Sequence, residues 1–140
     1  MSRALVFGQF GSIAILLFCG GWQMAWWAWG LFALGLGVFA WACLSLGGKN
    51  FTIMPEPRAG NTLSQTGIYR WLRHPMYTAV LLCGAAMAFG APSLWRWIAL
   101  GVCLVVLLLK VRYEERLLTQ HHPDYPQQMK GVARLLPLIW

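Results

Sequence analysis

The feature that most constrains this chain is a set of four long apolar runs, separated by short turns and one polar segment. They extend from about residue 4 to 21, 25 to 46, 76 to 91 and 94 to 109. A membrane helix needs roughly 20 mostly apolar residues, and lipid supplies no water to an unpaired backbone, so each run is expected to be helical. The sequence therefore predicts an all-α fold, a polytopic membrane helix bundle with about four transmembrane helices.

The composition supports this prediction and restricts the partners. Hydrophobic residues make up 59% of the chain and charged residues only 11%, outside the range of soluble globular domains. The net charge is +7, but the basic residues are interleaved with nine tryptophans and apolar runs. Membrane lipids with anionic headgroups are therefore the expected partners, and nucleic acid is not. The four cysteines all lie inside apolar runs and are expected to be free thiols, and no metal site is predicted.

We expect a single membrane domain over residues 1–140. Residues 1–46 form an N-terminal helical hairpin, and residues 47–74 form a polar loop whose Pro55, Pro57 and Gly60 prevent one continuous helix. Residues 75–140 form a second hairpin, whose last helix continues out of the membrane through Gln120 before an irregular tail.

Small residues recur at helical spacing in the second apolar run, and small residues let helices approach closely in lipid. This face is expected to pack against a neighbouring helix. Its members are Gly30, Ala33, Gly37 and Ala40.

The distribution of basic residues predicts the orientation. In a four-span arrangement ten of the eleven lysines and arginines fall on one side, and only Arg96 falls on the other. Because lysine and arginine accumulate in cytoplasmic loops, both termini and the long loop are predicted to be cytoplasmic in a multi-pass protein of an inner or plasma membrane.

Two polar clusters lie at the borders of apolar runs. The first is Arg73-His74-Pro75-Met76-Tyr77. Proline is well tolerated in the first turn of a helix, so Pro75 is expected to begin the third span. Free amides of that turn, with Arg73 and His74, would form an anion-binding corner. The alternative is that Arg73 and Tyr77 only anchor a helix among headgroups.

The second cluster follows the fourth run and comprises Lys110, Arg112, Glu114, Glu115 and Arg116. Lys110 and Glu114 are four residues apart and could pair along a helix, which would make the cluster a solvated helix end. Adjacent carboxylates point in different directions on a helix, so Glu114 and Glu115 are not expected to serve one pocket equally.

Together the clusters resemble the isoprenylcysteine carboxyl methyltransferase-like family of membrane methyltransferases, and phospholipid methyltransferases are similar in less detail. The resemblance extends from Phe51 to Pro137. It rests on a Gly-x-Tyr-Arg-x-x-Arg-His-Pro-x-Tyr segment, a paired-glutamate helix and an Arg-x-x-Pro tail, represented by Gly67, Tyr69, Arg70, Arg73, His74, Pro75, Tyr77, Glu114, Glu115, Arg134 and Pro137.

The resemblance implies S-adenosylmethionine as methyl donor and a lipophilic or prenylated small acceptor, methylated on a carboxylate or an amine. The loop, the C-terminal helix and the tail would form the donor site, and Glu115 is preferred over Glu114. The catalytic residues implied are His74, Arg112 and Glu115. The residues implied in donor binding are Tyr69, Arg73, His74, Pro75, Tyr77, Glu114, Glu115 and Tyr125.

Two other functions remain open at this point. The tail departs from the family pattern at Gln128 and Ala133, which would suit a non-catalytic membrane scaffold or subunit of the same fold. An enzyme of the sterol-reductase type would need a surface for a nicotinamide cofactor. The sequence does not indicate an oligomeric state.

Overall fold

The structure is a computed structural model that describes residues 2–47 and 65–136, and this part of the chain is helical with no strand. All four apolar runs form helices, as predicted, and the last helix ends one residue beyond the predicted Gln120. The elements are α1 Ser2–Phe18, α2 Trp26–Leu46, the 3₁₀ turn η1 Gly67–Arg70, α3 Pro75–Gly90, α4 Leu94–His121 and the short α5 Tyr125–Gln128.

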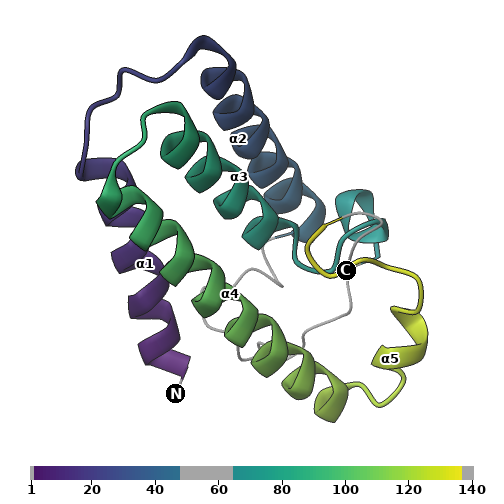
Figure 1. Ribbon diagram of the computed structural model, residues 1–140. Coiled ribbons are helices and arrows are strands. Elements are labelled where there is room, and N and C mark those ends of the chain that lie inside the picture. The colour runs from purple at the N-terminus through teal and green to yellow at the C-terminus, as the bar shows by residue number, and fades with distance from the viewer. Residues whose placement is uncertain (1, 48–64, 137–140) are drawn as a thin grey trace.

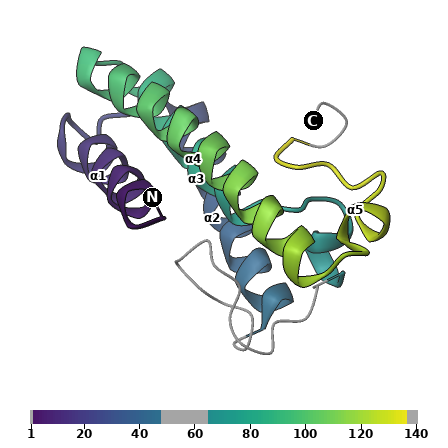
Figure 2. The ribbon, with the colours of Figure 1, turned by 90° about the horizontal axis from the view of Figure 1, so that it is seen from below.

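The four long helices pack as two neighbouring pairs. The helix α2 lies along α3, α1 lies along α4, and contacts between α3 and α4 join the pairs (Figure 1). Seen from below, α1 stands to one side of α4, whereas α5 and the tail lie on the other side (Figure 2). The first two helices are thus consecutive in the chain, but each packs mainly on a helix of the second hairpin.

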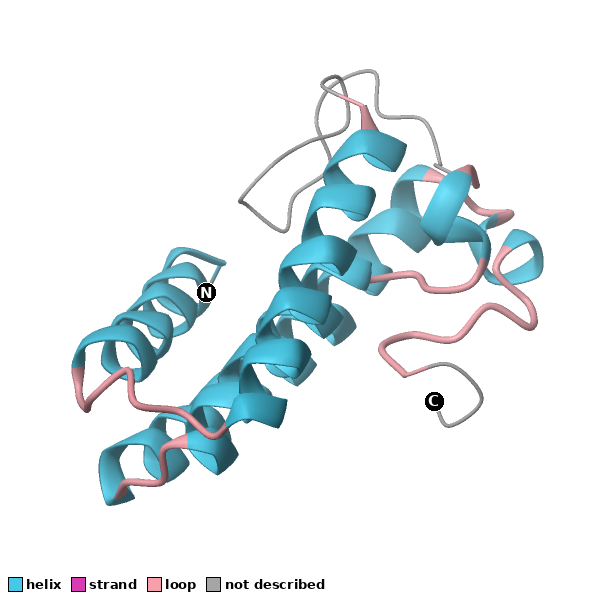
Figure 3. Cartoon of the chain, turned by 90° about the horizontal axis from the view of Figure 1, so that it is seen from above, coloured by secondary structure: helices cyan, strands magenta, loops and turns pink. Residues whose placement is uncertain are grey.

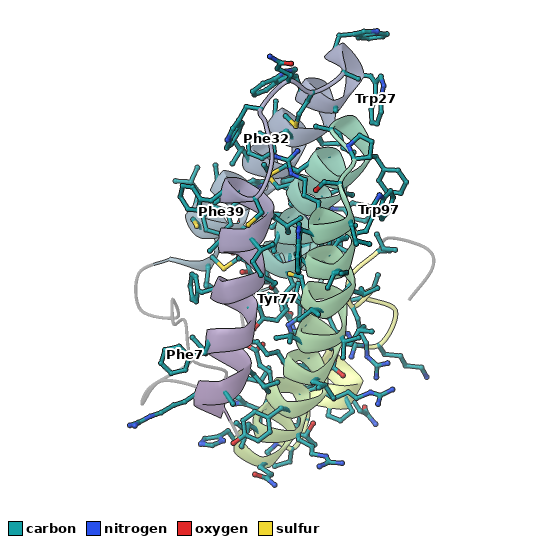
Figure 4. The ribbon with its side chains drawn as sticks, turned by 60° about the vertical axis from the view of Figure 1, so that its left-hand side comes forward. Phe7, Trp27, Phe32, Phe39, Tyr77 and Trp97 are labelled. Atoms are coloured by element: carbon teal, nitrogen blue, oxygen red, sulfur yellow. The ribbon has the colours of Figure 1, made fainter. Side chains whose placement is uncertain are left out.

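Two helices are long and apolar enough to cross a membrane. They are α2, with 21 residues, and α4, with 28; α1 and α3 are shorter apolar helices. A core helix of a soluble protein would bury its apolar residues, yet only 11% of the apolar stretch of α2 and 33% of that of α4 is buried. Phe7, Trp27 and Phe39 point outward in Figure 4, and this surface suits lipid. The chain is a membrane protein.

The packing face of α2 differs from the predicted one. Gly30 and Gly37 have no neighbouring atoms at the position of an added Cβ, and Ala33 and Ala40 are exposed. The buried face instead carries Ala28, Gly35 and Ala42, seven residues apart. A Cβ on Gly35 would overlap the sulfur of Cys83 at 2.5 Å, so α2 and α3 approach closely there. The expectation was wrong about the face because the sequence contains two rows of small residues at helical spacing.

The end of the bundle opposite the loop and tail is held by Arg96, which is fully buried. Its guanidinium donates to three backbone carbonyls, those of Leu16 at 3.2 Å, Ala91 at 2.9 Å and Gly21 at 2.9 Å. Arg96 therefore ties the connection after α1 to the turn between α3 and α4. It was the one basic residue predicted on this side.

An apolar groove lies between α1 and α2, with α3 as its floor. Its volume is about 180 Å³. On α3 it extends from Ala79 to Met87, beginning two residues after Tyr77. Its walls are apolar side chains that include Ile13, Leu17, Phe32, Leu36, Val80 and Cys83.

Candidate functional site

The candidate site begins where the chain enters α3. His74 occupies the N-cap position and Pro75 the first turn, as predicted. The segment before α3 runs alongside the tail, because the amide of Arg73 donates to Ala133 O at 2.8 Å and that of His74 donates to Arg134 O at 3.1 Å. Figure 3 shows these two non-helical segments next to each other. The tail thus fixes the backbone that carries His74.

The first turn of α3 has fewer free amides than were expected for an anion-binding corner. The amides of Tyr77 and Thr78 both donate to His74 O, at 3.1 and 3.2 Å, and Pro75 has no amide hydrogen. The short N-terminal turn therefore uses its own carbonyl as acceptor, so these amides are occupied.

The two glutamates of α4 lie on opposite sides of the His74 imidazole. Glu114 Oε2 is 3.5 Å from Nδ1, and Glu115 Oε1 is 3.6 Å from Nε2. The imidazole is buried, and its Nε2 has no hydrogen-bond partner among the described residues. Adjacent residues on a helix point about 100° apart. Since His74 lies between the two directions, both carboxylates reach it at similar distances, so at this residue they contribute more equally than expected.

Burial lowers the pKa of His74, but the neighbouring carboxylates of Glu114 and Glu115 raise it by more. The net result is a pKa above the ordinary value. The imidazole therefore keeps its proton to a higher pH than an exposed histidine would. When it is protonated, its positive charge lies between the two negative carboxylates.

Arg73 connects α4, the tail and the start of α3. Its Nε donates to Val132 O at 2.9 Å, and its two terminal nitrogens donate to Met129 O at 2.7 Å and Glu115 Oε1 at 3.1 Å. All three nitrogens of the guanidinium are used within the protein. Arg73 is consequently a clamp for the tail as well as a neighbour of His74.

Arg134 is a further member of the site. Its Nε lies 3.0 Å from Glu115 Oε2, so Glu115 binds one arginine from each side. The side chain of Arg134 is 39% exposed, against 17% for Arg73, and it is the more accessible of the two positive groups. The resemblance contained Arg134 in its Arg-x-x-Pro motif, and that motif was the signal for its place in the site.

Tyr77, in the first turn of α3, is half-buried, and in Figure 4 it is seen in the space between α1 and α4. Its hydroxyl donates to Glu114 Oε2 at 2.9 Å, and its ring stacks on the His74 imidazole, with centroids 5.5 Å apart and planes 5° apart. Lys110 Nζ lies 5.1 Å from the centroid of the same ring. The Tyr77 ring therefore connects His74, Glu114 and Lys110.

Two further predicted tyrosines border the site. Burial raises the pKa of Tyr69, and the charge of Glu114 raises it further. Burial likewise raises the pKa of Tyr125, with a second contribution from Glu115. Both phenols are therefore neutral at physiological pH and present a ring and a hydroxyl near the carboxylates.

The structure does not bring Arg112 into this cluster. Arg112 is exposed on α4, two residues before Glu114 and three before Glu115. The other predicted residues converge: Tyr69, Arg73, His74, Pro75, Tyr77, Glu114, Glu115 and Tyr125 lie around the start of α3 and the end of α4. Pro137, at the end of the predicted tail motif, lies outside the described residues.

Comparison with known proteins gives one family. Residues 22–124 match the family described as phospholipid methyltransferase. The matched segment contains α2, α3 and α4 with His74, Tyr77 and both glutamates, whereas α1 and the tail lie outside it. No curated protein sequence matches the chain.

Proposed function

The chain belongs to the phospholipid methyltransferase family, and we propose that it transfers a methyl group from S-adenosylmethionine to a lipid-anchored acceptor at the site around His74. The observation that carries the proposal is the buried imidazole held between two carboxylates and against Tyr77. A site of this polarity at the border of an apolar bundle is costly unless it is used.

The chemistry of the side chains fits the donor. S-adenosylmethionine carries a sulfonium, an ammonium, a carboxylate, a ribose diol and an adenine ring. Glu114 and Glu115 are suited to the ammonium or the diol, and Arg134 to the carboxylate. The buried Nε2 of His74, without a hydrogen-bond partner in the described structure, is available to a polar group of the ligand. Tyr69 and Tyr125 offer rings to a cation or to adenine.

S-adenosylmethionine supplies an electrophilic methyl group that an acceptor displaces in line. The residues of the site would align the two reactants and exclude water, and this alignment is the larger part of the rate enhancement for such a displacement. A carboxylate acceptor needs no base. An amine acceptor must be deprotonated, and Glu114 or the neutral form of His74 is in a position to take that proton.

The acceptor would approach from the bilayer. The apolar groove between α1 and α2 begins near Tyr77 and suits a single hydrocarbon chain, so an acceptor with its tail in the groove would have its head near His74. We expect Val80→Trp, which fills the groove, to lower methyl incorporation into extracted lipid about tenfold with labelled donor, and to leave donor affinity unchanged. An undiminished rate would exclude the groove as the tail site.

Titration with S-adenosylhomocysteine tests the donor site. Calorimetry of the protein in detergent or nanodiscs should show saturable binding, and His74→Ala and Glu115→Ala should each weaken it at least tenfold, or ~1.4 kcal/mol. The controls are His121→Ala and Asp124→Asn, which change an exposed histidine and an exposed carboxylate. Both should bind as the wild type does. Folded wild-type protein that binds no S-adenosylhomocysteine would refute the function and favour a non-catalytic membrane protein.

A further inference from the structure

Lys110 is a buried charge outside the set of residues implied by the family resemblance. It lies on α4 one turn before Glu114, and only 2% of it is exposed. Removing an ammonium from water costs several kcal/mol. A leucine would fill a helix contact at much lower cost, so a lysine in this place calls for an explanation beyond packing.

One partner of Lys110 comes from the first helix. Its Nζ donates to Gln9 Oε1 at 2.6 Å, and Gln9 is itself buried, with 8% exposed. The helix α1 lies outside the segment that matches the family, residues 22–124. Through Gln9, a helix outside that segment reaches the lysine that adjoins the candidate site.

Lys110 also lies beside Tyr77, a residue of the candidate site. Its ammonium lies 5.1 Å from the centroid of the Tyr77 ring. That ring stacks on His74, and the Tyr77 hydroxyl donates to Glu114. The ammonium is attracted to the face of the ring and to the carboxylate of Glu114. Tyr77 is therefore held on its ring by the lysine and at its hydroxyl by the glutamate.

The helix α1 has other contacts that attach it to the bundle. Apolar and small residues, including Leu5, Gly8 and Leu16, already bury the same face of α1, and Gly8 packs against Val106 of α4. At the other end, Arg96 holds Leu16 O. The Gln9–Lys110 bond is thus one of several contacts that attach α1, and its lysine lies beside the Tyr77 ring of the site.

We propose that Lys110 and Gln9 are positioning residues for the donor site: Gln9 orients the Lys110 ammonium, which fixes Tyr77 and Glu114 beside His74. This inference rests on the proposed function, because it concerns the same site. Neither residue touches the reacting groups in this arrangement; both act through Tyr77 and Glu114.

The test is a double-mutant cycle read as affinity for S-adenosylhomocysteine. Lys110→Met should weaken binding about tenfold and Gln9→Leu about threefold. In the Lys110→Met background Gln9→Leu should cause no further loss, because the residue it orients is gone. Additive losses would overturn the role of Gln9, and unchanged affinity in Lys110→Met would overturn the inference as a whole.

Controls separate positioning from structure. Ser12→Ala removes a buried hydroxyl of α1 that donates to Gly8 O and Gln9 O and also bonds to Cys103 of α4, so it tests loss of another polar contact of this helix. Lys130→Met removes an exposed charge, and both variants should bind like wild type. A purely structural role would lower the midpoint of thermal unfolding in Lys110→Met without changing the affinity of the folded protein.

The remaining outcomes are equally decisive. If Lys110→Met does not fold, Gln9→Leu alone still decides, since it leaves the lysine in place and unchanged affinity would overturn the inference. If the wild type binds no donor analogue, the proposed function fails and the inference fails with it. If the wild type binds and both variants bind equally well, the function stands and only the inference is rejected.

Discussion

Each end of the bundle has an arginine bonded within the protein, Arg96 fully buried and Arg73 partly exposed, and the two arginines have different partners. The Arg96 guanidinium donates to three backbone carbonyls, and no carboxylate of the described residues pairs with it. Arg73 donates to two backbone carbonyls and to Glu115, which also binds Arg134 and adjoins His74.

This difference in partners suggests that the Arg96 end only stabilises the fold, whereas the Arg73 end can also respond to a ligand. A carbonyl has one protonation state, so the Arg96 end has a single arrangement at any ordinary pH. The Arg73 end contains carboxylates and an imidazole whose charges can change and whose partners can be exchanged for those of a ligand. Loss of an arginine should therefore cost stability at one end, and both stability and donor affinity at the other.

The largest effect is expected for Arg96→Met. Three backbone carbonyls would lose their donor, that of Leu16 in a buried bond and those of Ala91 and Gly21 in partly buried ones. An unsatisfied buried polar group costs ~1–3 kcal/mol, so the free energy of unfolding should fall by about 3 kcal/mol. Unfolding in mixed micelles with increasing dodecyl sulfate measures this loss. Affinity for S-adenosylhomocysteine should stay within about twofold of wild type; a tenfold loss in folded protein would mean that the two ends are coupled.

A smaller loss of stability is expected for Arg73→Met. Its side chain is 17% exposed, so water can replace part of its bonding, and we expect a loss of about 2 kcal/mol in the same unfolding experiment. Donor affinity should also fall, about tenfold, because Glu115 loses a partner and the tail loosens. If Arg73→Met and Arg96→Met reduce only stability, the distinction between the ends is wrong.

The smallest effect is a dependence on pH that should occur at one end alone. The pKa of His74 is raised in the folded protein, so its charged form contributes stability that is fully present below the ordinary histidine pKa and is lost as the pH rises through the raised value. Wild type should therefore lose more unfolding free energy between pH 6 and pH 9 than His74→Gln. Parallel pH profiles would show that the imidazole proton contributes nothing to stability.

Much of the fold could be predicted because it depends on local pattern. The apolar runs predicted the four long helices, and Pro75 predicted the start of α3. The convergence of His74 with the two glutamates followed from the resemblance and not from spacing, since residues 40 positions apart have no local signal for contact.

The sequence-based predictions failed where the outcome depends on which segments of the fold meet. Helical spacing shows that small residues share a face but not which face meets a neighbour, so Gly35 was missed in favour of Gly30 and Gly37. At the start of α3, the Tyr77 amide that was expected to be free donates to His74 O. Gln9 and Lys110 were not recognised as a pair, because a contact between residues 101 positions apart depends on how α1 docks.

The pairing of the tail with the start of α3 has a consequence for biosynthesis. Translation produces His74 first, then Glu114 and Glu115, and only later Met129, Val132 and Arg134, whose groups complete the bonds of Arg73 and Glu115. A chain in which α2, α3 and α4 have packed but the tail has not docked thus has the carboxylates without the bonds that the tail adds to Arg73 and Glu115. Under the proposed function, donor binding would therefore depend on docking of a segment that is synthesised after both glutamates.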